Sequence, residues 1–361
     1  MASGILHKIF KKIIPVGSSI FVLSALSACH ESPDYSNSMY GNFDALVDII
    51  DTHYCFLDDK DIDWRELSSA YRNLITDETN YVDLFFICAA LLDELQDGHV
   101  NLSSQFTTSY YRNWWTDYPQ DFDLRTLQQY YLNFSWLTAG GMYYYMLPDD
   151  IGYIYYPSFS NTVGETALDY ILLSLQKTRG LIIDIRDNGG GALTNIDKFV
   201  ARFTNKKFIG GYIQHKTGPS HNDFSEPYPL EYSPASEYHV KYDGPIVILT
   251  NRSCFSAANS FVAVMKTLPQ VTVIGATTGG GGGMPFSSEL PIGWSIRFSA
   301  CPILDAEKNL IENGIEPNEV YEVHASSEEL AQGKDAILER AMDFLREKPL
   351  PEDSSEVSGE R

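Results

Sequence analysis

The chain has 361 residues, of which 44% are hydrophobic and 13% aromatic, and its formal net charge is −22 at pH 7. This length can support one to three domains, and the many aromatic residues argue against an intrinsically disordered chain. The strong negative charge argues against nucleic acid as a partner, because it would repel phosphate groups.

The first 28 residues have the pattern of a bacterial secretion signal. Lys8, Lys11 and Lys12 form a basic start, and the apolar stretch over 13–26 is short for a transmembrane helix. The sequence Leu-Ser-Ala-Cys, which ends at Cys29, resembles a lipobox. That resemblance implies cleavage before Cys29 and lipidation of its thiol. The protein would then be anchored in the bacterial cell envelope, at the outer membrane or the periplasmic face. The alternative is a simple signal peptide with an incidental cysteine.

A polar tether over 29–40 leads into a segment that is predicted to be helical. Apolar residues recur at helical spacing from Phe43 onward, over 64–75 and over 81–95. We therefore predict a small N-terminal helical domain over 41–105.

An aromatic-rich connecting segment over 106–150 follows, and we interpret its rings as packing between domains rather than as a substrate groove. Alternating residues over 142–146 and 152–156 predict a β-hairpin.

The main core is predicted over 151–348, before a polar tail over 349–361. Buried strands and helices alternate along it, which favours a parallel or mixed sheet with helices outside, and so an α/β core in a chain that is α+β overall. The predicted elements are a helix around 168–175, strands at 181–183, 245–250 and 271–274, helices at 195–203 and 253–268, a long loop at 216–237, a flexible glycine loop at 279–283, β segments over 286–303, and a last amphipathic helix after a capping box at Ser326 and Glu329.

Three stretches of the chain carry residues suited to chemistry. The strand at 181–183 ends in Asp-Asn-Gly-Gly-Gly, a turn that lets backbone N–H groups approach a ligand closely. Ser256 opens the helix after the strand at 245–250, where the helix dipole favours developing negative charge, although it could instead cap that helix. His99 could serve as the general base for a serine nucleophile, or it could complement a helix dipole. No pair of histidines has the spacing of a zinc site, so we predict no metal and no cofactor.

Together these stretches resemble the C-terminal processing (tail-specific) serine peptidases. The matching segments are Leu95–Val100, Leu181–Thr194, Asn251–Ala258 and Glu312–Asn318, in the order that the family has them. The resemblance covers most of 41–345. It implies a ClpP/crotonase-like core with a mixed β-sheet flanked by helices.

Departures from the family pattern indicate which branch of the family the chain resembles. Members with a Ser-Lys dyad carry a lysine where this chain has Gly281, so we do not expect that mechanism. The branch that includes the tricorn core uses a histidine and a glutamate, and His99 and Glu312 match those positions. Gly98 stands where tricorn has a serine, which leaves the support of His99 open between Glu312, Asp97 and a water. We expect no inserted PDZ domain, because the hairpin follows the aromatic segment too soon.

The resemblance implies a serine-type peptidase that cleaves peptides or unfolded protein tails through an acyl-enzyme. Ser256 would attack, His99 would move the proton, and the backbone N–H of Ala257 with that of Gly190 or Gly191 would hold the oxyanion. The alternative is a catalytically inactive member that acts as a ligand- or peptide-binding lipoprotein. The reasons for this alternative are the departures from the family pattern, which include an asparagine at 259 where the family usually has glutamate.

Overall fold

A computed structural model describes residues 34–350, and residues 35–350 belong to one compact unit. The predicted signal segment, the lipidated Cys29 and most of the polar tail lie outside the described residues. The predicted domain limits stay predictions. Within the part described, no helix is both long enough and apolar enough to cross a membrane.

The larger sheet holds the strand that precedes the glycine turn. Its strands run in the order β2-β3-β4-β5-β8-β9, with bounds Leu137–Ala139, Met142–Leu147, Ile151–Tyr155, Gly180–Asp184, Ile246–Thr250 and Val271–Gly275. Neighbours from β4 to β9 pair in parallel, whereas β2, β3 and β4 pair antiparallel, so the sheet is mixed as predicted. The predicted hairpin is the β3–β4 pair.

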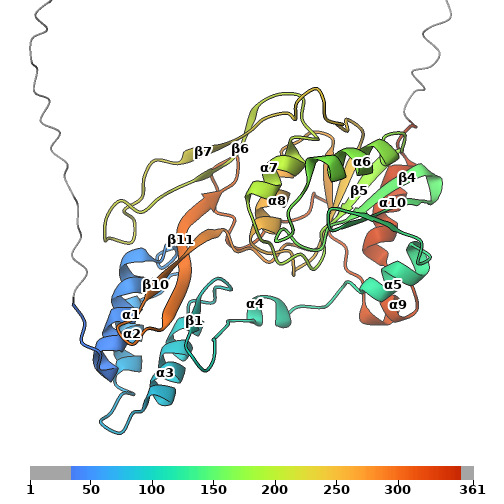
Figure 1. The fold of residues 1–361 in the computed structure, drawn as a ribbon. Coiled ribbons are helices and arrows are strands. Elements are labelled where there is room, and N and C mark those ends of the chain that lie inside the picture. The colour runs from blue at the N-terminus through green and yellow to red at the C-terminus, as the bar shows by residue number, and fades with distance from the viewer. Residues whose placement is uncertain (1–33, 351–361) are drawn as a thin grey trace, which may run out of the picture. The chain divides into compact units, whose positions relative to one another are not determined.

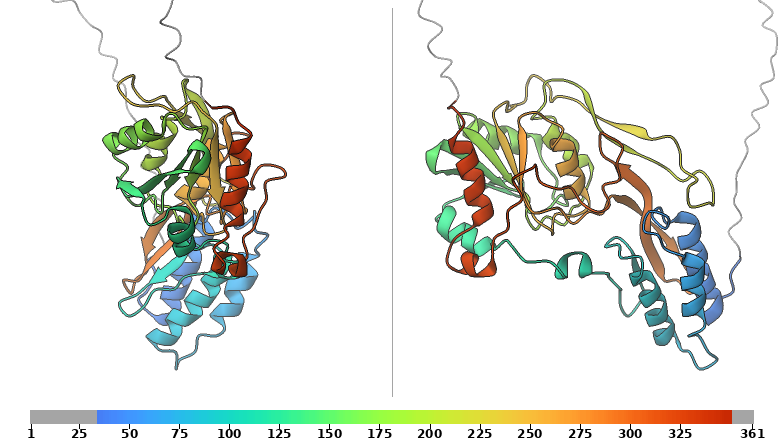
Figure 2. Two further views of the ribbon diagram at one scale, coloured as in Figure 1. Left: turned by 90° about the vertical axis from the view of Figure 1, so that its right-hand side faces the viewer. Right: turned by 180° about the vertical axis from the view of Figure 1, so that it is seen from behind.

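Helices cover both faces of this sheet, as Figures 1 and 2 show. One face packs on α6 (Glu165–Leu175), α7 (Thr194–Val200) and α8 (Ala257–Met265). The other packs on α9 (Ser327–Ala331), α10 (Ala336–Arg346) and the π-helical turn η1 (Leu127–Tyr131). In β5, Leu181 and Ile183 face the first layer while Ile182 faces the second. This explains the uninterrupted apolar run, because a strand buried on both faces needs apolar residues at every position.

A second sheet links the core to the N-terminal helices. It follows the order β1-β11-β6-β7, with β10 also paired to β11, and every pairing is antiparallel. The bounds are Asn101–Ser103 for β1, Phe208–Ile213 for β6, Tyr228–Tyr232 for β7, Gly283–Glu289 for β10 and Ser295–Leu304 for β11. The prediction of a long loop over 216–237 was therefore wrong at β7. This segment is a strand because its backbone pairs with β6, and its own sequence has no strand pattern that would have indicated it.

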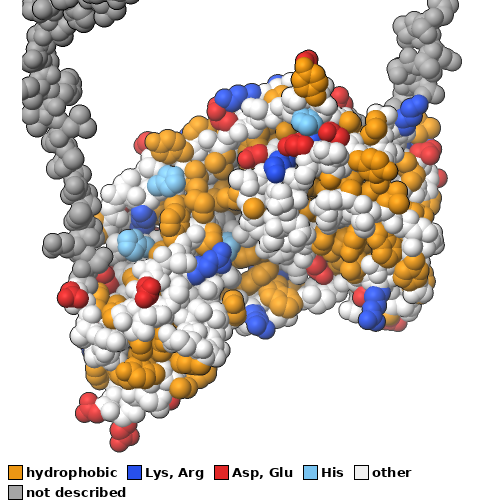
Figure 3. All heavy atoms as spheres, viewed as in Figure 1, with side chains coloured by type: hydrophobic (Ala, Val, Ile, Leu, Met, Phe, Trp, Pro, Cys, Tyr) orange, Lys and Arg blue, Asp and Glu red, His pale blue; other side chains and the backbone are white. Residues whose placement is uncertain are grey.

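The N-terminal helices α1 (Met39–His53), α2 (Trp64–Arg72) and α3 (Tyr81–Asp93) confirm the predicted helical segment. Their apolar sides share one core with Trp294, Ile296 and Phe298 of the second sheet and its turn. Three short helices complete the fold: α4 (Asn113–Thr116), α5 (Leu124–Thr126) and the 3-10 turn η2 (Pro148–Asp150). Figure 3 shows groups of hydrophobic side chains among the polar ones on one face. Tyr170 and Leu173 of α6 are among the exposed large apolar residues of the described chain.

Candidate active site

Ser256 lies in a strained turn between β8 and α8. Its backbone has φ 58° and ψ −121°, a conformation that costs a non-glycine residue about 1–3 kcal/mol. Its N–H donates to the Gly280 carbonyl oxygen at 2.8 Å. The Ser256 side chain makes no capping hydrogen bond to the described N–H groups of α8. The hydroxyl is instead 2.9 Å from Nε2 of His99, a residue 157 positions away.

His99 is held in a buried turn that follows α3. Only 3% of the residue is exposed, its backbone N–H donates to Oδ1 of Asp97 at 2.7 Å, and its ring contacts Phe255 with centroids 4.7 Å apart. Burial lowers the pKa of His99 to about 4, while the nearby Asp97 opposes this shift. The imidazole is therefore neutral near pH 7 and can accept a proton from the Ser256 hydroxyl.

Asp97 is the carboxylate that influences His99 most directly. Its Oδ2 accepts hydrogen bonds from the hydroxyls of Tyr54 at 3.1 Å and Ser299 at 2.8 Å. Tyr54 comes from the end of α1 and Ser299 from β11, so two distant elements fix the position of Asp97. A fixed negative charge beside the ring favours the imidazolium that forms during proton transfer.

Glu312 lies in the same buried cluster but makes no hydrogen bond to the imidazole among the described residues. Its carboxyl pairs with Nζ of Lys60 at 3.1 Å and accepts from the Gly282 N–H at 2.8 Å. Burial and then the charge of Asp97 raise the pKa of Glu312 to about 8, with Lys60 acting in the opposite direction. Nδ1 of His99 is buried, and none of the described residues is a hydrogen-bond partner for it. The structure therefore brings Ser256 and His99 together directly and places Glu312 beside Asp97.

The glycine turn after β5 packs against the nucleophile turn. Gly190 has φ +95°, and a Cβ there would lie 2.8 Å from Ser256 Cβ and 2.9 Å from the Ala257 nitrogen. A Cβ at Gly189 would meet nothing within 4 Å. Only the second glycine is thus required by the contact with Ser256. The N–H of Gly190 donates to Oδ1 of Asn188 at 3.0 Å.

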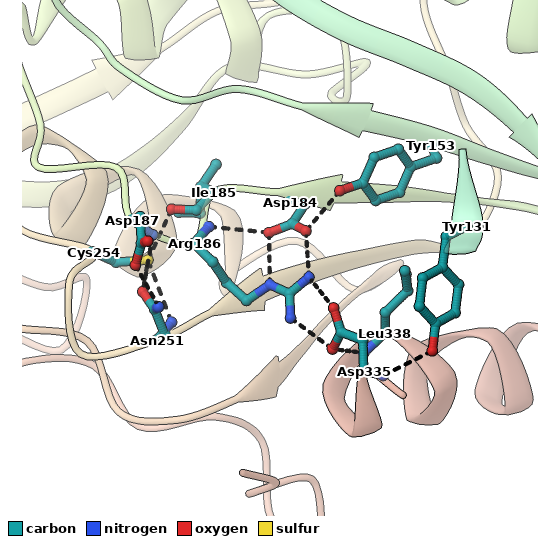
Figure 4. A network of polar contacts seen from close by, with 10 residues as sticks. All are labelled: Tyr131, Tyr153, Asp184, Ile185, Arg186, Asp187, Asn251, Cys254, Asp335 and Leu338. Carbon is teal, nitrogen blue, oxygen red and sulfur yellow. Dashed lines mark hydrogen bonds and ion pairs between the residues drawn. The ribbon is translucent and has the colours of Figure 1, made fainter. Parts of the chain in front are cut away.

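Hydrogen bonds between the two strand ends keep these turns in register. Asn251, which follows β8, accepts from the Asp187 N–H at 3.0 Å and donates to Oδ1 of Asp187 at 2.8 Å (Figure 4). The N–H of Phe255 also donates to the carbonyl of Asn188 at 3.1 Å. The polar residues after the apolar run of β5 therefore join the glycine turn to the residues around Ser256.

Arg186 anchors the same strand end to α10. Its guanidinium is fully buried between Asp184 and Asp335, with nitrogen–oxygen distances of 2.7–3.0 Å (Figure 4). Asp335 caps the N-terminus of α10 by accepting from the Leu338 N–H. Removing one partner of such a buried pair costs about 3–5 kcal/mol, because it leaves an uncompensated charge.

Two stacked aromatic rings, of Trp114 and Phe255, lie beside the nucleophile turn. Trp114 stacks on Phe255 with centroids 4.2 Å apart, whereas Tyr110, Tyr118 and Tyr130 of the aromatic segment are exposed, so the interpretation of that segment as packing stays a prediction. A Cβ at Gly281 would lie 2.5 Å from the Phe255 ring, and one at Gly98 would lie 2.6 Å from the Trp114 indole nitrogen. The structure thus leaves no room for a lysine at 281 or a serine at 98. The glycine loop is buried and hydrogen-bonded, so its prediction as flexible was wrong.

Sequence reasoning missed several members of the cluster. Lys60, Tyr54 and Ser299 belong to no motif, and their spacing along the chain relates to neither His99 nor Glu312. Phe255 was overlooked although it lies next to Ser256. An aromatic residue next to a proposed nucleophile could have been used to predict that Phe255 belongs to the site.

The chain matches two known sequence families in two separate parts. Residues 37–93 match the tricorn protease C1 domain, and residues 150–321 match peptidase family S41. A candidate peptidase from Parabacteroides merdae ATCC 43184 is 45% identical, with a TM-score of 0.82, and the match covers 86% of this chain and 97% of that one.

More distant relatives agree with this assignment. The carboxy-terminal processing protease CtpA of Bacillus subtilis (strain 168) is 28% identical over 49% of this chain and 36% of its own. The chain therefore spans about a third of the length of that curated relative. The tricorn protease, at 17% identity and a TM-score of 0.53 over 86% of this chain and 36% of its own, shares the fold.

The fold is thus of the ClpP/crotonase-like kind, with a mixed sheet flanked by helices and a helical region before it. The chain belongs to peptidase family S41, a family of serine-type hydrolases.

Proposed function

We propose that this chain is a serine-type peptidase that cleaves peptides or unfolded protein tails through an acyl-enzyme. The observation that carries the proposal is the 2.9 Å contact between Nε2 of His99 and Oγ of Ser256. A neutral, buried imidazole at this distance has the geometry and the protonation state of a general base.

The reaction would run in two halves. Oγ of Ser256 attacks the peptide carbonyl carbon while its proton passes to Nε2 of His99. The C–N bond then breaks, and Nε2 returns the proton to the leaving amine, which leaves an ester on Ser256. Water attacks that ester with His99 again as base, releasing the acid and restoring the hydroxyl.

Backbone N–H groups would hold the oxyanion. Ala257 is the first residue of α8, where N–H groups have no partner within the helix. Gly190 or Gly191 would supply the second donor. The N–H of Gly190 would have to exchange its partner Asn188 to do so. One donor of this kind is worth about 10²–10³ in rate.

Glu312 would act from its position beside Asp97 and not by a hydrogen bond to the imidazole. Its proton is retained up to about pH 8, so near pH 7 the anionic support of His99 would come mainly from Asp97. Lys60 and the Gly282 N–H would hold Glu312 beside Asp97. Asp97 and Glu312 would therefore have different roles within one buried site.

A serine-directed fluorophosphonate probe tests the activity. We expect it to label the wild-type protein and the control variant Ser253→Ala, which removes a hydroxyl three residues away, but not Ser256→Ala. His99→Ala should also abolish labelling, because the hydroxyl then has no base. Folded wild-type protein that resists labelling would contradict the proposal and favour the inactive binding protein.

We also propose that the protein is anchored to the bacterial cell envelope by a lipid on Cys29. The proposal rests on the residue pattern before and at Cys29, which lies outside the described residues. Cys29→Ala should release the protein from membranes and prevent incorporation of a fatty-acid analogue, whereas Cys88→Ala should change neither. Membrane attachment that survives Cys29→Ala would overturn this proposal.

A further inference from the structure

The loop over 214–227, which joins β6 to β7, lies beside α1 (Figure 1). In this loop Nε2 of His221 is 3.0 Å from Oδ1 of Asp51, which belongs to α1, and Nδ1 is 2.9 Å from Oδ1 of Asp58. We propose that His221 is a positioning residue for the proposed peptidase, and that it holds the turn after α1 in place only while both of its ring nitrogens carry a proton. This inference rests on the proposed function and adds a protonation requirement to the same site.

The turn over 54–62 carries two of the side chains that hold the buried carboxyl groups. The hydroxyl of Tyr54 donates to Oδ2 of Asp97 at 3.1 Å, and Nζ of Lys60 pairs with Glu312 at 3.1 Å. Nζ of Lys60 also donates to the carbonyl oxygen of Leu95, two residues before Asp97, at 3.0 Å. A displacement of this turn would therefore move the groups that fix the carboxylate beside His99.

Hydrogen bonds within the turn connect Asp58 to Lys60. The N–H of Lys60 donates to the carbonyl oxygen of Phe56 at 3.0 Å, and the N–H of Asp61 donates to that of Asp58 at 3.1 Å. The N–H of Cys55 donates to the carbonyl oxygen of Ser299 in β11 at 3.0 Å, so the start of the turn is fixed on the second sheet. Asp58 is thus the point at which the loop over 214–227 can hold the far part of the turn.

Both contacts of His221 require the imidazolium. An ionised carboxylate only accepts hydrogen bonds, so each ring nitrogen must donate, and the neutral imidazole has a single N–H. Burial lowers the pKa of His221, but the hydrogen bonds to Asp51 and Asp58 outweigh burial, and the pKa is raised above 6.5. The histidine therefore makes both contacts at pH 6 and loses one of them as the pH rises through its raised pKa.

The other groups around His221 leave this titration in place. The charged residues of the loop itself are Lys216, whose Nζ donates to the carbonyl oxygen of His221 at 2.9 Å, and Asp223, which accepts from the Ser220 N–H at 2.9 Å; they carry opposite charges. The Asn222 amide donates to Oδ2 of Asp58 at 2.6 Å and keeps this bond at any pH. Loss of the proton should therefore loosen the turn without releasing the loop.

The exposure of the partners sets the size of the effect. The side chains of His221, Asp51 and Asp58 are 30%, 54% and 46% exposed. A single ion pair at such exposure is worth up to about fivefold in an equilibrium constant, so two contacts that act together should be worth about threefold to tenfold.

The pH dependence of cleavage tests the inference. We expect kcat/KM of the full-length wild type on one peptide to exceed that of His221→Gln by about threefold to tenfold at pH 6, mainly through kcat, and the ratio to shrink toward one at pH 9. Asp58→Asn is a second variant and should show a similar loss at pH 6. The matched control is His239→Gln, because His239 is 31% exposed and contacts Asp169 of α6 at 2.9 Å, away from the turn. Its kcat/KM should equal that of the wild type at both pH values.

Hydrogen exchange separates this inference from the proposed function, because it needs no activity. In full-length Ser256→Ala at pH 6, His221→Gln should speed the exchange of the amides over 54–62 by about threefold or more, and His239→Gln should not. Unchanged exchange would overturn the inference whether or not the protein is a peptidase. Faster exchange with wild-type kcat/KM at both pH values would overturn the positioning role and leave the peptidase standing. Faster exchange in a protein whose wild type resists fluorophosphonate labelling would support the contact of His221 with the turn and contradict the peptidase.

Discussion

Gly190→Ala is the sharpest test of the proposed site, because it adds one methyl group against the nucleophile turn. That methyl would lie 2.6 Å from the Phe255 carbonyl oxygen, 2.8 Å from Ser256 Cβ and 2.9 Å from the Ala257 nitrogen. Two of these three atoms belong to the backbone, so no side-chain rotation can relieve the contacts. Gly190 also has φ +95°, which alanine adopts only with strain.

The magnitude follows from these two costs. Left-handed backbone strain in a non-glycine residue is about 1–2 kcal/mol, and overpacking adds about 1–3 kcal/mol. We therefore expect a loss of about 2–5 kcal/mol in the free energy of unfolding. The two turns should move apart, and a displacement of the order of 1 Å at a reacting group lowers the rate about 10²-fold.

Gly189→Ala is the matched control. A methyl group there would meet nothing within 4 Å, so stability and rate should change little. Urea unfolding, the rate of fluorophosphonate labelling and kcat/KM on a peptide should be measured for both variants. A folded Gly190→Ala protein with wild-type labelling and kcat/KM would refute the view that this glycine positions Ser256.

Four further predictions concern the buried ionisable groups. Because burial lowers the pKa of His99 to about 4, kcat/KM should fall on the acid side near pH 4 instead of near 6.5, the value of an exposed histidine, and a midpoint near 6.5 would contradict this. At pH 7, Asp97→Asn should lower kcat/KM more than Glu312→Gln does, because Glu312 is then mostly protonated; equal losses would refute the assignment. The pKa of Glu312 is raised from 4.5 to about 8, so the free energy of unfolding of the wild type should fall as pH rises through that interval. Urea unfolding at pH 5 and at pH 9 should show a smaller fall in this free energy for Glu312→Gln than for the wild type. Arg186→Met should cost about 3–5 kcal/mol in urea unfolding by leaving Asp184 and Asp335 unpaired, and a loss below about 1 kcal/mol would contradict the role of this network.

Local patterns were enough to predict most of the elements of the fold. The apolar run of β5, the amphipathic spacing of α6 and the capping box before α9 each depend on neighbours within one turn or one strand. The strand β7 was not predicted, because its pairing with β6 and not its own sequence pattern makes it a strand. The burial of the loop at 279–282 was not predicted. Its glycines allow close packing against Phe255 and Glu312 and do not make the loop flexible.

The sequence by itself determined that the chain has an α/β core, a glycine turn after a doubly buried strand, and Ser256 and His99 as candidates for nucleophile and base. The core and the strand follow from periodicity and residue type, which burial imposes locally along the chain, whereas the roles of Ser256 and His99 follow from the resemblance of their motifs to those of the tail-specific peptidases. Only the tertiary structure decided that the two side chains meet at 2.9 Å. It also decided that Tyr54 and Ser299 hold Asp97, and that Lys60 pairs with Glu312 beside it. Such contacts join residues far apart in the chain, so they depend on how sheets and helices pack, and no local spacing encodes them.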